Sequence, residues 1–267
     1  MSTAVQQAPA FSPTPSQIAV AYSVCRSIAR SSAKNFYYAF LALPQAKRQA
    51  LCAVYAFMRR CDDITDDASL PLRDRRQKLA EWLDAVHRAL LGHPTDDPVL
   101  IALTDTQQRY KIVPELLDQL AYGTAMDVQE SDGDSRTGVS APHAQYRTFE
   151  DLRVYCYRVA SVVGLICIRI FGYRDSAAEP LAENLGLAFQ LTNIIRDVKE
   201  DAVMGRIYLP QEDLEKFDVS PSELHSDGDS ARLRLLLASV ADRAREYYRS
   251  ADELILLVDE DSQPALW

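Results

Sequence analysis

The stretch that decides the fold is LGLAFQLTNIIRDVKEDA, Leu185–Ala202, an apolar segment that becomes acidic towards its end. Its apolar residues recur every three or four positions, which is typical of an α-helix with one buried face. Asn193, Asp197 and Asp201 are four residues apart, so they fall on one side of that helix. Their amide and carboxylate oxygens are hard ligands of the kind that Mg²⁺ prefers. The pattern therefore predicts a helix that presents a metal site.

A second acidic stretch, DDITDD, covers Asp62–Asp67 and follows the apolar run ALCAVYAFM. Positions three, four or seven residues apart share one helical face, and here that face carries Tyr55, Arg59, Asp62, Asp63 and Asp66. Like charges at this spacing repel one another, so a bound cation would stabilise them. Arg59 would then hold a phosphate group whose other oxygens reach the metal.

Each acidic stretch also has a plainer interpretation. DDITDD alone is equally consistent with an exposed acidic helix end, because acidic runs are common on surfaces. The stripe containing Asn193 is open to being a surface stripe whose partners are Arg196 and Lys199. However, Gln190 extends that stripe, and an amide at Asn193 suits a neutral metal ligand better than a solvated face. The two stretches together favour the metal site.

The bulk properties exclude several classes of protein. The chain has 267 residues, of which 48% are hydrophobic, enough for a sizeable core. Its net charge of -9 argues against general nucleic-acid binding, which needs a basic surface. The five cysteines form no CxxC pair, so neither a zinc site nor a disulfide framework is indicated, and a reducing cytoplasm fits. Residues 1–17 lack the apolar stretch of a signal peptide, and we expect a disordered tail there and one domain over 18–267.

Long apolar-periodic segments separated by helix breakers predict an all-α fold. The sequence contains no internal repeat and no repeated βαβ pattern. Predicted helices cover approximately Gln17–Ser32, Gln45–Asp66, Leu72–Leu91, Pro98–Arg109, Pro114–Gln129, Thr148–Phe171, Ala177–Glu200 and Ala231–Val258. The polar segments 129–146 and 220–230 are expected to be surface loops within one domain.

The longest apolar run, Val159–Tyr173, contains Arg169 and is shorter than the roughly 18 residues that a membrane span needs. We interpret it as a buried helix and leave peripheral membrane contact open. A stripe at spacing four could line an apolar tunnel or simply pack in the core; it consists of Tyr155, Val159, Val163, Cys167 and Phe171. Ser161 and Gly164 leave room for close approach by another helix or by a chain-like substrate.

Two basic segments flank these features. Lys34 lies in SSAKNFYYAF, Ser31–Phe40, and could donate to a phosphate. Arg206 lies in GRIYLP, Gly205–Pro210, which could fold over the second acidic stretch as a flap. Either segment could instead be a helix terminus with exposed charge. The four histidines lack metal-ligand spacing, and we assign them no role.

Five of these segments, in this order, resemble the squalene/phytoene synthase family of trans-isoprenyl diphosphate synthases. They are SSAKNFYYAF, AVYAFMRRCDDITDD, YCYRVASVVG, LGLAFQLTNIIRDVKEDA and GRIYLP, within a resemblance that spans about Ser31–Tyr248. The resemblance implies an all-α isoprenoid-synthase bundle of helices around a central apolar cavity. It also implies about three Mg²⁺ ions and the head-to-head (1'-1) condensation of two prenyl diphosphates.

Carried onto this sequence, the resemblance implies a role for each motif residue. The metal ligands would be Asp62, Asp63, Asp66, Asn193, Asp197 and Asp201. The groups that bind diphosphate would be Lys34, Arg59, Arg196 and Arg206. Tyr55, Tyr155 and Gln190 would face the reacting carbons. The tunnel would be lined by Phe36, Val159, Val163, Cys167 and Phe171.

Within the family, YCYRVASVVGLICIRIFGY is most similar to the bacterial hopanoid branch, which makes presqualene diphosphate from farnesyl diphosphate. The prediction is therefore a cytoplasmic farnesyl-transferring enzyme that contacts the membrane peripherally at most. NADPH would be needed only if squalene were the end product. The first alternative is a phytoene synthase that uses two geranylgeranyl diphosphates. An alternative of another class is a non-catalytic helical protein that binds prenyl lipids.

Two features depart from the family pattern. The polar insertion around Ser131–His143 is longer than the usual link. The final residues, Ser262–Trp267, resemble the start of a further helix, and the family normally continues with more helices that help to close the cavity. We therefore expect a chain truncated at its carboxyl end, with the oligomeric state left open.

Overall fold

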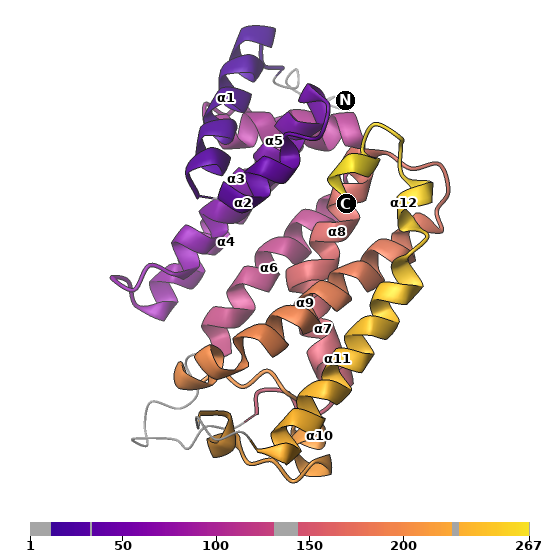
Figure 1. The fold of residues 1–267 in the computed structure, drawn as a ribbon. Coiled ribbons are helices and arrows are strands. Elements are labelled where there is room, and N and C mark those ends of the chain that lie inside the picture. Colours follow the sequence, from indigo (N-terminus) through magenta and orange to yellow (C-terminus); the bar gives the residue numbers. More distant parts are fainter. Residues whose placement is uncertain (1–11, 33, 131–143, 226–229, 267) are drawn as a thin grey trace, which may run out of the picture. The chain divides into compact units, whose positions relative to one another are not determined.

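The computed structural model describes residues 12–32, 34–130, 144–225 and 230–266 (Figure 1). Within these ranges the secondary structure is helical, with one isolated β-bridge between Tyr173 and Val258. The all-α prediction is confirmed. The chain divides into two compact units, one ending at Ala121 and the other beginning at Tyr122. The prediction of one synthase domain over residues 18–267 stays a prediction.

The first unit is built around three helices that pack on one another, α1, α3 and α5. Its elements are α1 (Pro15–Ser32), α2 (Lys34–Phe40), α3 (Gln45–Thr65), α4 (Leu72–Leu90), α5 (Pro98–Tyr110) and the start of α6 (Pro114–Glu130). The Asp97 side chain caps α5 by accepting from the backbone N–H of Val99 at 2.8 Å, and Pro98 occupies the first helical position. Cys25, Cys52 and Phe57 are completely buried in this core.

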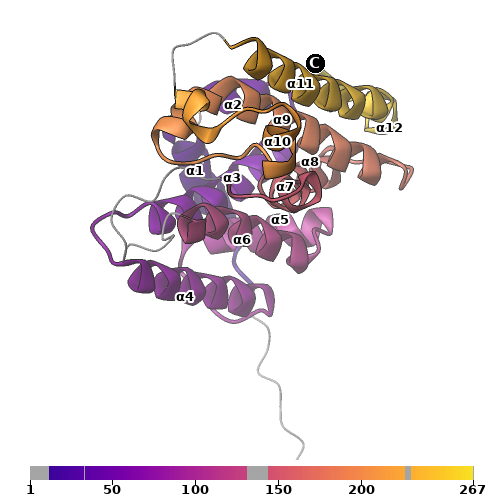
Figure 2. The ribbon, with the colours of Figure 1, turned by 90° about the horizontal axis from the view of Figure 1, so that it is seen from below.

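The second unit is organised around α9, which runs alongside α11 in both views (Figure 1, Figure 2). Its elements are α7 (Phe149–Cys156), a π-helical turn η1 (Tyr157–Ser161), α8 (Val162–Phe171), α9 (Ala178–Val203), α10 (Gln211–Lys216), η2 (Pro221–His225), α11 (Ala231–Ala251), α12 (Leu254–Leu257) and η3 (Gln263–Ala265). A cluster of buried apolar side chains joins α9 to α11, and Leu191 and Leu236 are completely enclosed in it.

Helix α9 approaches the π-helical turn unusually closely at Gly186. A methyl group added there would lie 2.5 Å from Ser161 Cα. The hydroxyl of Ser161 donates to the backbone carbonyl of Glu183 at 2.7 Å. One turn further on, a methyl group at Gly164 would lie 2.9 Å from the Ala182 carbonyl oxygen. The room that Ser161 and Gly164 leave is therefore filled by another helix.

Several predicted boundaries need correction. The helix expected over Thr148–Phe171 is interrupted by η1, where the backbone N–H of Val162 bonds to the Tyr157 carbonyl, five residues earlier. The helix expected to reach Val258 ends at Ala251, because the chain turns there and Val258 pairs with Tyr173. The short helices α2 and α10 were not predicted, since six or seven residues give little periodic signal.

Other predictions fall partly outside the described residues. The proposed tail covers residues 1–17, of which 1–11 are not described, and α1 already begins at Pro15. The insertion at 131–143 also lies outside them. By length and composition, the helical run Phe149–Phe171 could cross a membrane, but 44% of its most apolar window is buried within the protein. Core helices of soluble proteins pass the same test.

Candidate active site

The second acidic stretch forms the last turns of α9. Asn193, Asp197 and Asp201 are all partly exposed, whereas Leu191 and Ile194 of the same helix are buried. The carboxyl end of a helix carries a partial negative charge. Two carboxylates placed there raise the negative potential further, so the position favours a bound cation.

Arg196 forms a two-pronged ion pair with Asp197. Its Nε donates to Oδ1 at 2.7 Å, and a terminal nitrogen donates to Oδ2 at 2.6 Å. This hydrogen-bonded pair lowers the pKa of the Asp197 carboxyl. Asp197 is therefore ionised at neutral pH, as a metal ligand must be. The salt bridge that the sequence left open is present, and Asn193 donates to Gln190 Oε1 at 3.5 Å.

The chain leaves α9 through a turn that returns Arg206 to the acidic stripe. The backbone N–H of Arg206 bonds to the Asp201 carbonyl at 2.8 Å, and that of Gly205 bonds to the Ala202 carbonyl at 2.9 Å. These two bonds, with Gly205 at a φ of 79°, define a Schellman motif. The local backbone therefore brings the Arg206 residue back to the end of α9, next to the last predicted metal ligand in the chain.

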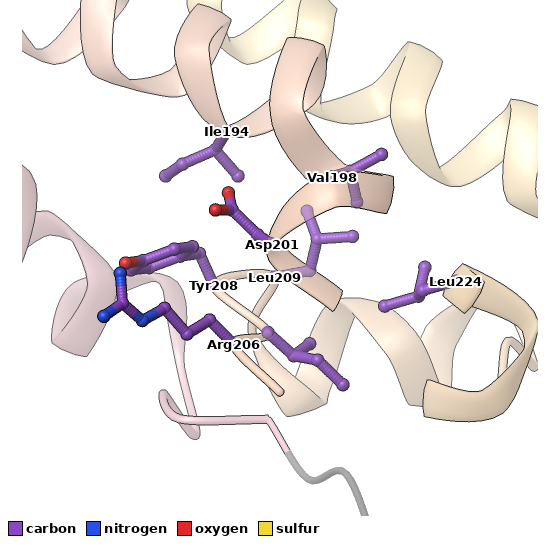
Figure 3. Close-up of a pocket in the computed structure, with 8 residues that line it drawn as sticks. Ile194, Val198, Asp201, Arg206, Tyr208, Leu209 and Leu224 are labelled. Carbon is purple, nitrogen blue, oxygen red and sulfur yellow. The ribbon is translucent and has the colours of Figure 1, made fainter. Parts of the chain in front are cut away.

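Asp201 and Arg206 line a small pocket with room for about one water molecule (Figure 3). Its walls are otherwise mostly apolar and are formed by Ile194, Val198, Ile207, Tyr208, Leu209 and Leu224. Figure 3 shows the Asp201 carboxylate above the Tyr208 ring, with Arg206 extending along that ring towards its hydroxyl end. The pocket thus combines one carboxylate, one guanidinium and one phenol.

Three buried tyrosines stack beside this pocket. The Tyr155 ring lies 5.2 Å from the Tyr208 ring and 5.6 Å from the Tyr146 ring, measured between centroids. The segments carrying them are paired through the backbone, with the Gln211 N–H donating to the Tyr146 carbonyl at 2.9 Å. Sequence reasoning selected Tyr155 but missed Tyr146 and Tyr208. The tyrosine inside GRIYLP was a usable signal for Tyr208.

The predicted tunnel stripe does not share one environment. Tyr155 and Phe171 are buried, whereas Val159, Val163 and Cys167 keep some exposed surface. The π-helical turn adds a residue to one helical turn, so a spacing of four does not follow a single face through it. The Cys167 thiol nevertheless lies deep enough for burial to raise its pKa to about 12. The tunnel role of these residues stays a prediction.

The first acidic stretch occupies the end of α3 in the other unit. Asp62 is partly exposed there, whereas Asp63 and Asp66 are exposed. Arg59 binds Asp63 one turn away, with 2.6 Å between nitrogen and oxygen. Arg75 closes the end of the helix by donating to the Thr65 carbonyl at 3.1 Å. As in α9, the carboxylates gather where the helix dipole is negative.

The remaining predicted residues of this unit are less fully described. Tyr55 lies partly buried on α3, and burial raises the pKa of its hydroxyl. Lys34 and Phe36 lie in α2, but their side chains are outside the described part of the structure. The roles assigned to them stay predictions.

The donors fit Mg²⁺ by their chemistry. Among the described residues, no group of three or more His, Cys, Asp or Glu side chains is placed to hold a metal. Mg²⁺, however, is usually held by one or two carboxylates and completes its octahedron with water and substrate phosphates. The two carboxylates and one amide on the exposed face of α9 match that requirement. We therefore keep these residues as candidate ligands.

An all-α protein with aspartate-rich stretches at the ends of two helices has the features of the isoprenoid-synthase class. The chain belongs to the squalene/phytoene synthase family, whose sequence model matches residues 29–267. The predicted family is thereby confirmed, and the chain is a prenyl-transferring enzyme of the kind that condenses prenyl diphosphates head to head.

Individual relatives carry different names. A phytoene synthase from Mycobacterium tuberculosis is 39% identical over 253 residues, which cover 92% of this chain and 77% of that protein. A presqualene diphosphate synthase from Zymomonas mobilis is 32% identical over 229 residues, which cover 86% of this chain and 74% of that protein. The two names give different products, phytoene and presqualene diphosphate, so they do not indicate one substrate length.

Solved structures support the fold. A dehydrosqualene synthase in complex with a ligand matches with a TM-score of 0.80 and 34% identity, covering 94% of this chain and 82% of that one. A squalene synthase from Alicyclobacillus acidocaldarius matches with a TM-score of 0.82 and 29% identity, covering 95% and 90%. The predicted isoprenoid-synthase fold is confirmed.

Proposed function

We propose that this chain condenses two prenyl diphosphates head to head, with Mg²⁺ as cofactor. C1 of one substrate bonds to the C2–C3 double bond of the other, and the first product is a cyclopropylcarbinyl diphosphate. The observation that carries the proposal is the face of α9 that presents Asn193, Asp197 and Asp201, with Arg206 turned back towards it. That arrangement offers hard oxygen donors on α9 and a guanidinium at the pocket that Asp201 lines, which suits a metal-bound diphosphate.

The proposed site residues fall into two groups: those that bind Mg²⁺ and those that bind diphosphate. In this proposal the Mg²⁺ ligands of α3 are Asp62, Asp63 and Asp66, and those of α9 are Asn193, Asp197 and Asp201. Bound there, Mg²⁺ would stabilise the negative charge that develops on the leaving diphosphate. Lys34, Arg59, Arg196 and Arg206 bind the diphosphate oxygens, and the arginines do so as planar forks suited to phosphate.

The reaction needs a site that protects a cation. Loss of diphosphate from one substrate leaves an allylic cation, whose C1 is attacked by the C2–C3 double bond of the second substrate. Loss of a proton, to a tyrosine hydroxyl or to the released diphosphate, closes the cyclopropane. Tyr55, Tyr155 and Gln190 lie near the reacting carbons in this proposal. The aromatic rings stabilise positive charge, and the apolar side chains of Phe36, Val159, Val163, Cys167 and Phe171 exclude water.

Two substrate lengths are supported by different observations. Farnesyl diphosphate, the C15 substrate, is favoured by YCYRVASVVG at Tyr155–Gly164 and by the presqualene diphosphate synthase relative. Geranylgeranyl diphosphate, the C20 substrate, is favoured by the more similar relatives that are named phytoene synthases. A bulky side chain at the far end of the tunnel stripe would favour the shorter C15 substrate. Phe171 is buried at that end, which is equally compatible with a purely structural role.

The proposal also covers the cellular location of the enzyme, its pathway and its need for a reductant. We place it in the cytoplasm, with peripheral membrane contact for its apolar substrates and a role in hopanoid synthesis if the C15 reading holds. NADPH would be used only if presqualene diphosphate were reduced onward to squalene. A prenyl-lipid-binding protein without activity is the alternative of another class.

Product analysis tests these readings together. The purified chain is incubated with equal concentrations of farnesyl and geranylgeranyl diphosphate and Mg²⁺, with and without NADPH, and the lipids are identified by mass spectrometry. Presqualene diphosphate as main product supports the C15 reading, and a C40 product supports the C20 reading. Binding of either substrate without turnover would support the non-catalytic alternative.

A further inference from the structure

The segment that carries Arg206 and Tyr208 is attached at both ends. At its start, the Schellman turn binds the Arg206 backbone to Asp201. At its other end, Pro210 leads directly into α10, a helix of only six residues. A helix this short is not stable alone and depends on tertiary contacts. Between these ends, Ile207 and Leu209 are buried in the core, and the Gln145 N–H donates to the Ile207 carbonyl at 3.1 Å. The position of the segment therefore depends on this burial and, at its carboxyl end, on what holds α10 in place.

A buried ion pair holds α10 to α11. Asp213, in the first turn of α10, is only 4% exposed. Arg243 of α11 donates one terminal nitrogen to Asp213 Oδ2 at 2.9 Å and the other to Oδ1 at 3.4 Å. A buried carboxylate keeps its charge only when it is paired in this way. The pair therefore fixes both the distance and the orientation of α10.

The same arginine also contacts α7. Its guanidinium lies 4.1 Å from the centre of the Phe149 ring, a stacking contact that orients its plane. The backbone N–H of Phe149 donates to Glu212 Oε1 at 2.7 Å. Consecutive residues of α10, Glu212 and Asp213, are thus bound to α7 and α11. These contacts lie within five residues of Tyr208.

Helix α11 does not need this pair to stay on α9. Its buried residues Leu233, Leu236, Val240 and Ala244 already pack in the core cluster. By contrast, Asp213 and Leu214 are the buried residues of α10. The loss of the ion pair should therefore act mainly on α10 and on the segment that precedes it.

We propose that Asp213 and Arg243 are positioning residues for the condensation reaction. They hold the Arg206–Leu209 segment so that the Arg206 side chain stays at the pocket that Asp201 also lines. The inference rests on the proposed role of Arg206 in binding diphosphate. The new part is that two side chains outside the pocket, Asp213 of α10 and Arg243 of α11, keep Arg206 in position for that role.

A double-mutant cycle tests the inference. Affinity for inorganic diphosphate in the presence of Mg²⁺ is measured by calorimetry for the parent chain, Asp213→Asn, Arg206→Gln and the double variant. We expect Asp213→Asn to weaken binding by about tenfold, with a matching rise in KM for the prenyl diphosphate and a smaller change in kcat. In the Arg206→Gln background the same change should have no further effect.

Glu179→Gln is the matched control. It neutralises the Arg169–Glu179 pair between α8 and α9, which lies away from the Arg206–Leu209 segment. The arginine is buried to a similar degree and the distance is 3.1 Å, but the carboxylate side chain is 39% exposed, against 6% for Asp213. Diphosphate affinity should stay within about twofold of the parent chain, because screening and exposure make such pairs weak. Circular dichroism checks the folding of every variant. If Asp213→Asn does not fold, Arg243→Lys replaces it in the cycle, since lysine keeps the charge but loses the fork and the stacking.

The outcomes distinguish the positioning role of Asp213 and Arg243 from the role of Arg206 in binding diphosphate. Additive losses from Asp213→Asn and Arg206→Gln would overturn the positioning role while leaving Arg206 in the diphosphate site. A folded Asp213→Asn or Arg243→Lys variant that binds diphosphate like the parent chain would overturn it as well. An Arg206→Gln variant with unchanged affinity would remove Arg206 from the site, and the positioning role with it.

Discussion

The two acidic stretches end their helices in different ways. After α3, the chain continues from Asp66 without a return turn, and an arginine from α4, Arg75, caps the helix from outside. After α9, the Schellman turn at Gly205 sends Arg206 back to Asp201. Each stretch has an arginine on its own helix, Arg59 beside Asp63 and Arg196 beside Asp197. The difference lies in how the helix ends: α3 is capped by a side chain from a neighbouring helix, whereas α9 is closed by the backbone of its own turn.

The largest expected effect tests whether the two stretches are equivalent in catalysis. Asp62→Asn and Asp197→Asn should each lower kcat by at least about 100-fold, because each removes charge that stabilises the leaving group through the metal. The thermal midpoint of Asp62→Asn should stay within about 2 °C of the parent chain or rise slightly, because repulsion within its cluster falls. That of Asp197→Asn should fall slightly, because the ion pair with Arg196 is lost. Steady-state kinetics at saturating Mg²⁺ and thermal denaturation measure both quantities. Near-normal turnover in either variant would remove that residue from the metal shell.

The next effect concerns the packing that holds α9. Gly186→Ala places a methyl group 2.5 Å from the backbone of Ser161, which cannot rotate away. We expect a loss of about 3 kcal/mol in the free energy of unfolding, as for an overpacked core. Urea denaturation measures it. An unchanged midpoint would mean that the close approach of α9 and η1 is not needed for the second stretch.

A smaller effect is expected at the turn that distinguishes the two stretches. Gly205→Ala meets no neighbour within 4 Å, so its cost comes only from the positive φ of 79°. We expect about 1 kcal/mol of destabilisation, together with weaker diphosphate binding as Arg206 becomes less fixed. Gly205→Asn serves as the control and should recover part of both losses, because asparagine tolerates this conformation better. If alanine and asparagine behave alike, the turn does not position Arg206.

The smallest effect is electrostatic. In Arg196→Gln the pKa of Asp197 should rise towards the ordinary aspartate value, because its main hydrogen-bonding partner is lost. A carboxyl whose folded pKa is depressed contributes stability above its unfolded pKa of about 3.9, and that stability is lost as the pH falls through the folded value. The variant should therefore lose less stability on acidification in that window. Carbon-13 titration of the carboxyl in metal-free protein measures the pKa, and an unchanged value would mean that the pair does not persist in solution.

Much of the helical framework could be predicted from the sequence, because helix periodicity and capping are local. Pro44 precedes α3 and Pro71 precedes α4, so both starts were visible as breakers. The shared face of Asn193, Asp197 and Asp201 followed from spacing alone. The short helices α2 and α10 escaped, because a segment of six or seven residues is stabilised by its surroundings more than by its own pattern.

By itself the sequence determined the family, the helical class and the residue types offered to metal and diphosphate, since these depend on motifs and on periods of three to four residues. Only the tertiary structure decided that Tyr146 and Tyr208 stack with Tyr155, that the helix through Ser161 contains a π-helical turn, and that Arg243 reaches Asp213. The physical reason is that these contacts join residues far apart in the sequence. Their free energy arises only when separate elements pack together, so no local sequence pattern predicts them.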